Sequence, residues 1–522
     1  MGDILASIAL SMLRVCLSAL VVGVPLVLLA CTSASQGTPA PAPPVSSATA
    51  PATPPVSPEP GQIRLLKTSP EVGPVGTPFT LSGEGLPPGK GVEFQWATVN
   101  GSFAVKASTS AVKYEQRRFA PKRVPLGRAV TDAQGRVTAT FNAPEDYGEI
   151  HEIYGVVDGR DMAKGGFRIL RTATISPTEG PVGTPITITV KGLGWKPFEH
   201  SMGVLYDNKY TGFISAVTSR GSAVFQVRAA GPPGKHAVRL NSAGKAVPYI
   251  NIQQSPFSYL PQFNFLFTVT KDAGPPPDRV DGPEGQRAAS ANAAVPGITD
   301  GRAVAMPGVQ AVLEPASGPV LSQSTLRARG LPPNADVELL WATVKDNATT
   351  STGRTLHTPS LMKATAAQDG SLVASVPIPD DLGGWHAVRL VTDKETLADA
   401  PYYVERSLVS VTPKRVKTGE TFTIKIKGAG WTELDNAVAV TYDNAYIGYA
   451  SSQGNSGDIT IALPATGGPG THLLDLYPLI YTGRDKTWWG YRLPFLTFAR
   501  DFPGIELGYR LSTFRLAIQV VE

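Results

Sequence analysis

The feature that most constrains the fold of this 522-residue chain is an internal duplication. SPTEGPVGTPITITVKGLGW at 176–195 recurs as TPKRVKTGETFTIKIKGAGW at 412–431, and GPVGTPFTLSGEGLPPGKGVEFQWATV at 73–99 recurs as GPVLSQSTLRARGLPPNADVELLWATV at 318–344. The first offset stays at 236 residues, whereas the second falls from 245 to 235, so the first copy carries a ten-residue insertion, around positions 113–128. Because repeats of this length are structural units, the chain consists of four modules in the order A, B, A′, B′.

Each module has the residue pattern of half-buried β-strands. Apolar and polar residues alternate in GVEFQWATV, PITITVKG, GVLYDN, SAVFQVRA and HAVRLN, and glycine-bearing turns separate such runs. Asp207-Asn208 and Asp443-Asn444 lie between two runs, as expected of tight hairpin turns that tolerate positive φ. The sequence therefore predicts an all-β protein: four tandem Ig-like β-sandwiches in an A-B-A′-B′ duplication, after a signal peptide and a disordered tether.

The turn motifs carry a family resemblance. The succession P-x-x-G-P-x-G-T-x-x-T-[IL], then G-x-G-W or G-L-P-P, a Tyr-Asp-Asn hairpin and G-x-H-x-[VL]-x-L resembles the Ig-like repeats of bacterial surface proteins, and its first half is similar to IPT/TIG domains. The resemblance covers about 63–271 and 305–522. Because these motifs are turn chemistry and strand pattern, they imply a fold and no particular function.

Changes of composition along the chain predict its organisation. The expected segments are a lipoprotein signal peptide at 1–30, a tether rich in Pro, Ala and Ser at 31–62, module A at 63–170, module B at 171–271, a linker at 272–304, module A′ at 305–405, and module B′ with an aromatic-rich C-terminal extension at 406–522. No linker composition separates A from B, since FRILRTATISPTEG passes directly from one strand to the next. We therefore expect each A-B pair to be a stiff two-domain unit.

An apolar run near the N-terminus predicts export. Residues 15–30 (VCLSALVVGVPLVLLA) are too few for a comfortable membrane span but suit the hydrophobic core of a signal peptide. The run leads into Leu-Leu-Ala-Cys at 28–31, which resembles the lipobox of bacterial lipoproteins and implies a diacylglycerol thioether on Cys31. An ordinary secretory signal that ends near a cysteine is the alternative. Because Asp3 stands where signal peptides prefer positive charge, we expect translation to start at Met12.

The expected lipid defines the location and one partner of the protein, a membrane. The chain has two cysteines, Cys16 and Cys31, so no disulfide framework exists in its body. Residues 32–61 contain nine prolines and one charge, the composition of a tether that reaches up to about 90 Å when extended. Thr32, in place of aspartate, favours the outer membrane in a Gram-negative cell. We expect an exported, lipid-anchored protein of the cell envelope.

Charge restricts the class of soluble partner. The net charge of +5 is accounted for by one stretch, 113–128, which contains Lys113, Arg117, Arg118, Lys122, Arg123 and Arg128 against Glu115 alone. No nucleic-acid-binding motif accompanies this stretch, and a nucleic-acid binder would spread a basic face over a recognisable fold. We therefore expect no nucleic-acid partner.

The histidines decide whether the chain looks like an enzyme. HAVRL contains His236 in module B and His386 in module A′, and His151 and His472 occupy the same place in the other two modules. A catalytic histidine rarely recurs once per structural unit, so we expect each imidazole to cap a turn or to bond a loop carbonyl. The sequence has no HExxH, paired-cysteine, G-x-S-x-G or P-loop motif. We expect no enzyme activity, no metal and no cofactor.

Two further sets of residues are expected to have no direct role in binding or catalysis. Trp96 and Trp341, each in WATV, are expected in the sandwich cores. The acidic turns PEDYG at 144–148 and PDDLG at 379–383 are expected to be solvated or to cap turns. Calcium between domains is the alternative for these turns, although the chain lacks a calcium loop of the D-x-D-x-D-G kind.

Two segments depart from the repeat pattern and are the candidate contact sites. They are the basic insertion, with Arg117, Arg118, Lys122 and Arg123, and the C-terminal stretch TGRDKTWWGYRLPFLTFARDF at 482–502, with Trp488, Trp489 and Tyr491. The alternatives are a solvated loop for the first and an internally packed edge for the second. We expect a non-catalytic binding, adhesion or spacer module whose partner is an unidentified envelope protein or polysaccharide. The second hypothesis is a carbohydrate-binding surface protein that uses the Trp-rich loop.

Overall fold

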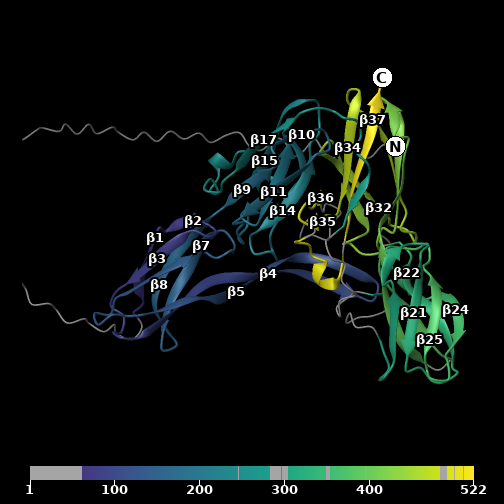
Figure 1. Ribbon diagram of the computed structural model, residues 1–522, viewed down its shortest axis with the longest axis horizontal. Coiled ribbons are helices and arrows are strands. Elements are labelled where there is room, and N and C mark those ends of the chain that lie inside the picture. Colours follow the sequence, from purple (N-terminus) through teal and green to yellow (C-terminus); the bar gives the residue numbers. More distant parts are fainter. Residues whose placement is uncertain are drawn as a thin grey trace, which may run out of the picture. The chain divides into compact units, whose positions relative to one another are not determined.

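The computed structural model of the protein (Figure 1) describes residues 62–244, 246–282, 295–296, 304–347, 353–393, 395–482, 491–498, 500–509 and 511–522. All of them lie in one compact unit, Pro55–Glu522. The predicted signal peptide, Cys31 and the tether residues 32–61 lie outside the described residues, as do Trp488 and Trp489.

The described part of the chain is built from β-strands and contains no α-helix. Its two helical elements are the short 3₁₀ turns η1 (Ile252–Gln254) and η2 (Ile505–Leu507). Within these residues, neither helical turn has the length and apolar character that crossing a membrane requires. The prediction of tandem β-sandwiches is confirmed. Modules B, A′ and B′ each contain a three-stranded and a six-stranded sheet, and module A contains one eight-stranded sheet that forms both layers.

Module A contains the longest strands of the described chain, which form a single hairpin. Its strands are β1 (Arg64–Ser69), β2 (Val72–Pro74), β3 (Pro78–Gly83), β4 (Gly91–Ser108), β5 (Ala111–Val130), β6 (Val137–Asn142), β7 (Glu149–Val157) and β8 (Arg160–Leu170). One layer is β1-β3-β6 and the other is β5-β4-β7-β8, and β1 joins the two by a short parallel pairing with β8. The fully buried Phe79, Phe94 and Trp96 fill the space between the layers.

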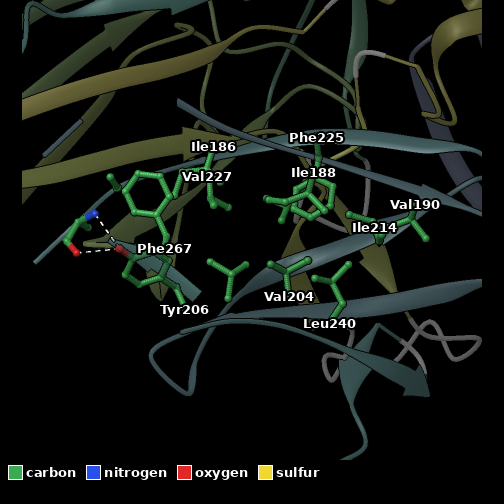
Figure 2. Close-up of a cluster of buried hydrophobic side chains, with 14 of the residues drawn as sticks. Ile186, Ile188, Val190, Val204, Tyr206, Ile214, Phe225, Val227, Leu240 and Phe267 are labelled. Atoms are coloured by element: carbon green, nitrogen blue, oxygen red, sulfur yellow. Dashed lines mark hydrogen bonds between the residues drawn. The ribbon is translucent and has the colours of Figure 1, made fainter. Parts of the chain in front are cut away.

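Module B shows how the alternating pattern makes a core. Its strands are β9 (Thr172–Ser176), β10 (Glu179–Gly180), β11 (Pro185–Lys191), β12 (Ser201–Tyr206), β13 (Lys209–Ser215), β14 (Ala223–Arg228), β15 (Gly234–Gly244), β16 (Val247–Pro248) and β17 (Phe263–Val269). Ile186 and Ile188 on β11 face Val204 on β12 and Leu240 on β15 (Figure 2). Tyr206 closes one end of this core, since its hydroxyl donates to the Ala230 carbonyl at 2.8 Å (Figure 2).

Modules A′ and B′ repeat this architecture. In A′ the strands are β19 (Gln310–Glu314), β20 (Ser317–Pro319), β21 (Gln323–Arg329), β22 (Asp336–Lys345), β23 (Thr355–His357), β24 (Ser360–Thr365), β25 (Leu372–Pro377), β26 (Gly384–Val391) and β27 (Thr396–Glu405). In B′ they are β28 (Ser407–Thr412), β29 (Arg415–Lys417), β30 (Thr421–Lys427), β31 (Ala437–Tyr442), β32 (Ala445–Ser451), β33 (Ile459–Pro464), β34 (Gly470–Tyr477) and β37 (Thr513–Val521), with the hairpin β35 (Leu479–Thr482) and β36 (Tyr491–Pro494) between the last two.

The predicted hairpin turns are confirmed. Asp207 and Asn208 connect β12 to β13 with φ of 49° and 61°, and Asp443 and Asn444 connect β31 to β32 with φ of 47° and 62°. Two consecutive positive φ values are the signature of a type I′ turn, which matches the twist of the flanking strands.

Part of the predicted linker forms structure in B′. Residues Arg279–Asp281 form β18, which pairs antiparallel with β37 at the edge of the larger B′ sheet. Upstream of β18, both carboxylate oxygens of Asp272 accept hydrogen bonds from Thr471, at 2.6 Å from its amide and 2.7 Å from its hydroxyl. The segment that leaves module B therefore completes the sheet of B′ and does more than connect the two halves.

Candidate functional site

The recurring histidines belong to one structural motif that is present in all four modules. In each, Nε2 lies 2.7–2.9 Å from the carbonyl oxygen four residues earlier in the chain. Nδ1 contacts a strand carbonyl in the A-type modules, as between His151 and Ala97 at 2.8 Å, and an aspartate in the B-type modules, as between His236 and Asp207 at 2.6 Å. The prediction that each imidazole bonds a loop carbonyl is confirmed, and both ring nitrogens have a polar contact in every module.

An aromatic ring lies beside each of these imidazoles. Trp96 stacks on His151 with ring centroids 4.4 Å apart, and Trp341 stacks on His386 at 4.8 Å. Both tryptophans are fully buried, as predicted, and their indole N–H groups donate to Asp146 at 3.0 Å and to its counterpart in the second acidic turn at 2.8 Å. The acidic turns therefore cap the core tryptophans. Among the described residues, no group of three or more His, Cys, Asp or Glu side chains could hold a metal ion.

The A/B and A′/B′ junctions are built in the same way. The amide of Gly148 donates to Leu193 O at 3.1 Å, and the amide of Gly383 donates to Ala429 O at 2.9 Å. The first residue of the second module in each pair is a buried arginine. At the A′/B′ junction this residue is Arg406, which donates to the backbone carbonyl of Asp435. Burial raises the pKa of the Asp435 carboxyl to about 6. Backbone hydrogen bonds therefore join the two modules of each pair directly.

A second set of buried charges joins module B to module B′. Arg228 at the end of β14 donates to Leu516 O at 2.6 Å and pairs with the carboxylate of Asp475 on β34. Arg515 on β37 pairs with the same carboxylate at 3.0 Å, and the side-chain Nδ2 of Asn444 donates to Arg228 O at 2.7 Å. The sequence does not reveal these contact residues, because a single charged residue in a strand does not indicate its partner in another module.

The basic insertion is a strand and not a loop. Residues 113–128 lie within β5, which pairs with β4 along its whole length. The pairing of β4 with the sandwich strand β7 ends at Trp96, which lies opposite Val124 of β5. Residues 97–123 therefore extend beyond the module A sandwich as a two-stranded ribbon, here called the strap.

The inner face of the strap packs on module B. At Gly101 a Cβ atom would lie 2.1 Å from the carbonyl oxygen of Val217, so glycine permits a close backbone approach there. Phe119 packs edge-on against Tyr147 with ring centroids 5.8 Å apart. Burial, and then the cation of Arg117, lower the pKa of His200 to about 3.

The tip of the strap docks on the second pair. Val112 is 1% exposed, and its carbonyl accepts a 3.2 Å hydrogen bond from the amide of Glu433 in B′. The apolar cluster that contains Val112 draws on modules B, A′ and B′ and on the C-terminal stretch, and includes Phe213, Trp385, Tyr403, Trp431, Leu434, Phe495, Phe502 and Tyr509. The insertion therefore connects the first module to the last.

The outer face of the strap is cationic. Lys106, Lys113, Arg118 and Lys122 are exposed, and none of them belongs to an ion pair found among the described residues. The other two candidate residues differ. Arg117 is half-buried, with Nε and Nη2 lacking a hydrogen-bond partner, and Arg123 pairs with Asp161 at 2.9 Å and 3.0 Å. Of the four predicted contact residues in the strap, Arg118 and Lys122 are therefore available to a partner, and Lys106 and Lys113 are two available cations that were not predicted as contact residues.

A surface groove of about 450 Å³ lies at the base of the strap. Its charged lining consists of Glu93, Arg123, Arg128, Asp158 and Asp161. Arg128 pairs with Glu93 at 3.0 Å and Arg123 with Asp161, so the charges of the groove largely neutralise one another. The remaining carboxylate, Asp158, pairs with Lys90 at 3.0 Å, so each charged side chain of the groove has an ion-pair partner.

The described part of the C-terminal aromatic stretch is internally packed. Phe495 and Phe502 are fully or almost fully buried, and Phe495 stacks on Phe213 of module B at 4.8 Å. The carboxylate of Asp501 accepts hydrogen bonds from Ser215 Oγ at 2.6 Å and from the Thr218 amide at 2.7 Å. The predicted contact residues Trp488 and Trp489 lie outside the described residues. Tyr491 begins β36, of which only the backbone is described at this position.

Comparison with known proteins finds only solved structures of low identity and low TM-score among those reported below. No protein-family model and no curated protein matches the chain. A Salmonella alpha-2-macroglobulin structure is 11% identical with a TM-score of 0.17, covering 86% of this chain and 30% of that one. The ICAM-5 D1–D4 ectodomain fragment is 11% identical with a TM-score of 0.18, covering 83% and 100%. Invasin, a bacterial integrin-binding protein, is 12% identical with a TM-score of 0.19, covering 83% and 79%.

Proposed function

We propose that the protein is a non-catalytic binding and spacer module of the bacterial cell envelope, anchored by lipid on Cys31. The observation that carries the proposal is the strap: module A reaches across module B to the A′/B′ junction, where Val112 meets Glu433. Four sandwiches joined in this way present one preorganised surface, and preorganisation lowers the entropy lost when a partner binds.

The residues that could have suggested catalysis support this proposal. The four recurring histidines each use Nε2 in a loop-carbonyl contact, and the acidic turns cap the core tryptophans. The recurring histidines and the acidic turns therefore have structural roles in the modules.

The sequence supports the location. The lipobox-like Leu-Leu-Ala-Cys at 28–31 and the proline-rich residues 32–61 would hold the modules at a distance from the membrane surface. A single acyl chain binds membranes only reversibly, whereas several chains on one cysteine give stable anchoring.

Fractionation of cells tests the anchor. The wild-type protein is expected in the membrane fraction, and the Cys31→Ser variant in the soluble exported fraction. Cys16→Ser is the matched control and should leave the protein in the membrane. Membrane association of Cys31→Ser equal to wild type would refute the anchor.

Sedimentation with envelope fragments tests the binding role. The full-length protein in non-ionic detergent is added to fragments prepared from cells that lack it. Saturable binding is expected, and binding that rises linearly without saturation would contradict a specific envelope partner.

A further inference from the structure

We propose that the outer face of the strap binds an anionic polysaccharide, a sugar chain that carries phosphate or carboxylate groups. This inference names the partner class for the proposed function and rests on it. The strap has six cationic side chains and one carboxylate, Glu115. Four of the cations, Lys106, Lys113, Arg118 and Lys122, are exposed and take part in no ion pair among the described residues.

Like charges face each other at the tip of the strap. Lys106 on β4 is the direct cross-strand neighbour of Lys113 on β5. Side chains in this relation have Cβ atoms about 5 Å apart, and like charges there destabilise a hairpin. Glu433 of B′ interacts electrostatically with Lys113 and offsets part of this repulsion. An anion bound between the two ammonium groups would offset more of it.

The remaining cations extend this charge along the ribbon. Arg118 and Lys122 are four residues apart on β5, with no register shift between them, so they project from the same face about 13 Å apart. The β4 half of the strap, residues 97–108, spans about 40 Å. Within this length the four cations occupy the register positions of residues 98–106, a row of about 26 Å. Such a row matches a linear polyanion, which engages the cations one after another and gains affinity from multivalency.

The surroundings of these cations disfavour a protein or a nucleic acid. None of the exposed large hydrophobic side chains lies within residues 97–123, whereas protein interfaces centre on apolar or aromatic anchors. The aromatic rings of the strap are engaged elsewhere: Phe119 packs on Tyr147, and Phe103 packs edge-on against Tyr114 at 6.1 Å. Without free rings on which bases can stack, a single-stranded nucleic acid loses its usual platform.

The strap is held in place before any ligand arrives. Its tip is fixed by Val112 in the shared apolar cluster, and its middle is fixed by the contact of Gly101 with Val217. Binding therefore does not have to order the ribbon, which is a cost that flexible basic loops incur.

The test uses the full-length protein in non-ionic detergent and defined probes. These are polygalacturonate for carboxylate, dextran sulfate for a stronger acid, and neutral dextran of matched length. Binding to both anionic polymers, weakening as salt increases, is expected, with none to neutral dextran. The double variant Arg118→Gln/Lys122→Gln should bind at least tenfold more weakly at low salt and show a shallower salt dependence, because two ionic contacts are lost.

The matched control is Arg329→Gln/Lys425→Gln. It removes the same charge from exposed positions on A′ and B′, and its affinity should stay within twofold of wild type. An equal loss in both double variants would show that net charge alone is responsible and would overturn the proposal. The proposal would also be overturned if the protein bound neither polygalacturonate nor dextran sulfate.

Two further arms distinguish other sources of negative charge. Vesicles containing phosphatidylglycerol report a membrane surface, and polyglutamate reports an acidic polypeptide. Strap-dependent binding to either one, without binding to the polysaccharides, would replace the proposed partner. Such results would leave the proposed function intact, because the Cys31→Ser fractionation and the envelope sedimentation do not depend on the strap cations.

Discussion

The amide of Glu433 in module B′ donates a 3.2 Å hydrogen bond to the carbonyl of Val112 at the tip of module A. This bond closes the strap onto the second A-B pair. The ten-residue insertion supplies the reach, since β4 has 18 residues and its counterpart β22 has 10. The insertion that distinguishes the first copy from the second therefore connects the two copies.

Replacing the apolar tip should release the strap. Val112→Asp places a carboxylate in a site that is 1% exposed, and burying an unpaired charge is strongly unfavourable. Trypsin should then cleave after Lys113, Arg117 or Arg118 at least tenfold faster than in the wild type, as followed by mass spectrometry of early fragments. Val130→Asp is the control, because Val130 is 69% exposed on the same strand. Equal cleavage rates in Val112→Asp and wild type would show that the tip does not hold the strap.

The A′/B′ junction should not tolerate a methyl group at its closest point. A Cβ on Gly383 would lie 1.8 Å from the carbonyl oxygen of Gly428. We expect Gly383→Ala to lower the free energy of unfolding by about 2 kcal/mol or more, since backbone atoms must move apart. Urea denaturation measures this change. Gly454→Ala, which adds its Cβ to open space, should leave the midpoint unchanged, and a Gly383→Ala midpoint equal to that of this control would contradict the junction.

The buried charges between B and B′ should be costly to break singly. Arg228→Met removes one cation from Asp475 and leaves its carboxylate with Arg515 alone. The expected loss is about 3 kcal/mol, because the remaining buried charge is less well compensated. The comparison is Arg327→Met, which breaks the exposed pair with Glu314 and should cost less than about 1 kcal/mol. Similar losses for the two variants in urea denaturation would argue against a buried B/B′ contact.

The A-type histidines should make stability fall in acid. Burial lowers the pKa of His386, and this effect outweighs the nearby Asp381 carboxylate and the backbone carbonyls, which act in the opposite direction. The unfolded chain then takes up a proton at about pH 6.5, above the pKa in the folded state, so stability is lost as the pH falls below about 6.5.

Comparison with a histidine variant isolates this contribution. The difference in Tm between wild type and His386→Gln should narrow from pH 7.5 to pH 5.5, because the variant cannot take up the proton. The exposed His357→Gln variant is the control for the loss of a surface histidine, and its Tm at pH 7.5 should stay close to that of the wild type. A difference that widens in acid for His386→Gln would mean that the folded protein holds this imidazole as a cation.

Local patterns in the sequence determined most of the architecture. Alternation of apolar and polar residues placed Trp96 and Trp341 in cores, and the Asp-Asn pairs marked type I′ turns. The repeat of one histidine per module indicated a structural role, which the carbonyl contacts confirm. These features could be predicted from the sequence because strand period and turn chemistry depend on residues that are close together in the chain.

Part of the candidate site could also be predicted from the sequence. Arg118 and Lys122 are exposed and unpaired among the described residues, as a partner contact requires. Arg123 is neutralised by Asp161, and Arg117 is half-buried beside module B. The sequence does not show which cations keep their charge free, because each ion-pair partner lies on a different strand of the folded module.

Only the tertiary structure decided the roles of the two segments that depart from the repeat pattern. The basic stretch was expected as a loop or a contact site and is a strand whose tip is buried, and the aromatic stretch buries Phe495 and Phe502 against module B. Val112 meets Glu433, and Asp501 meets Ser215, across hundreds of residues. Such pairings depend on which module surfaces come together, a property of the whole fold that no local period records.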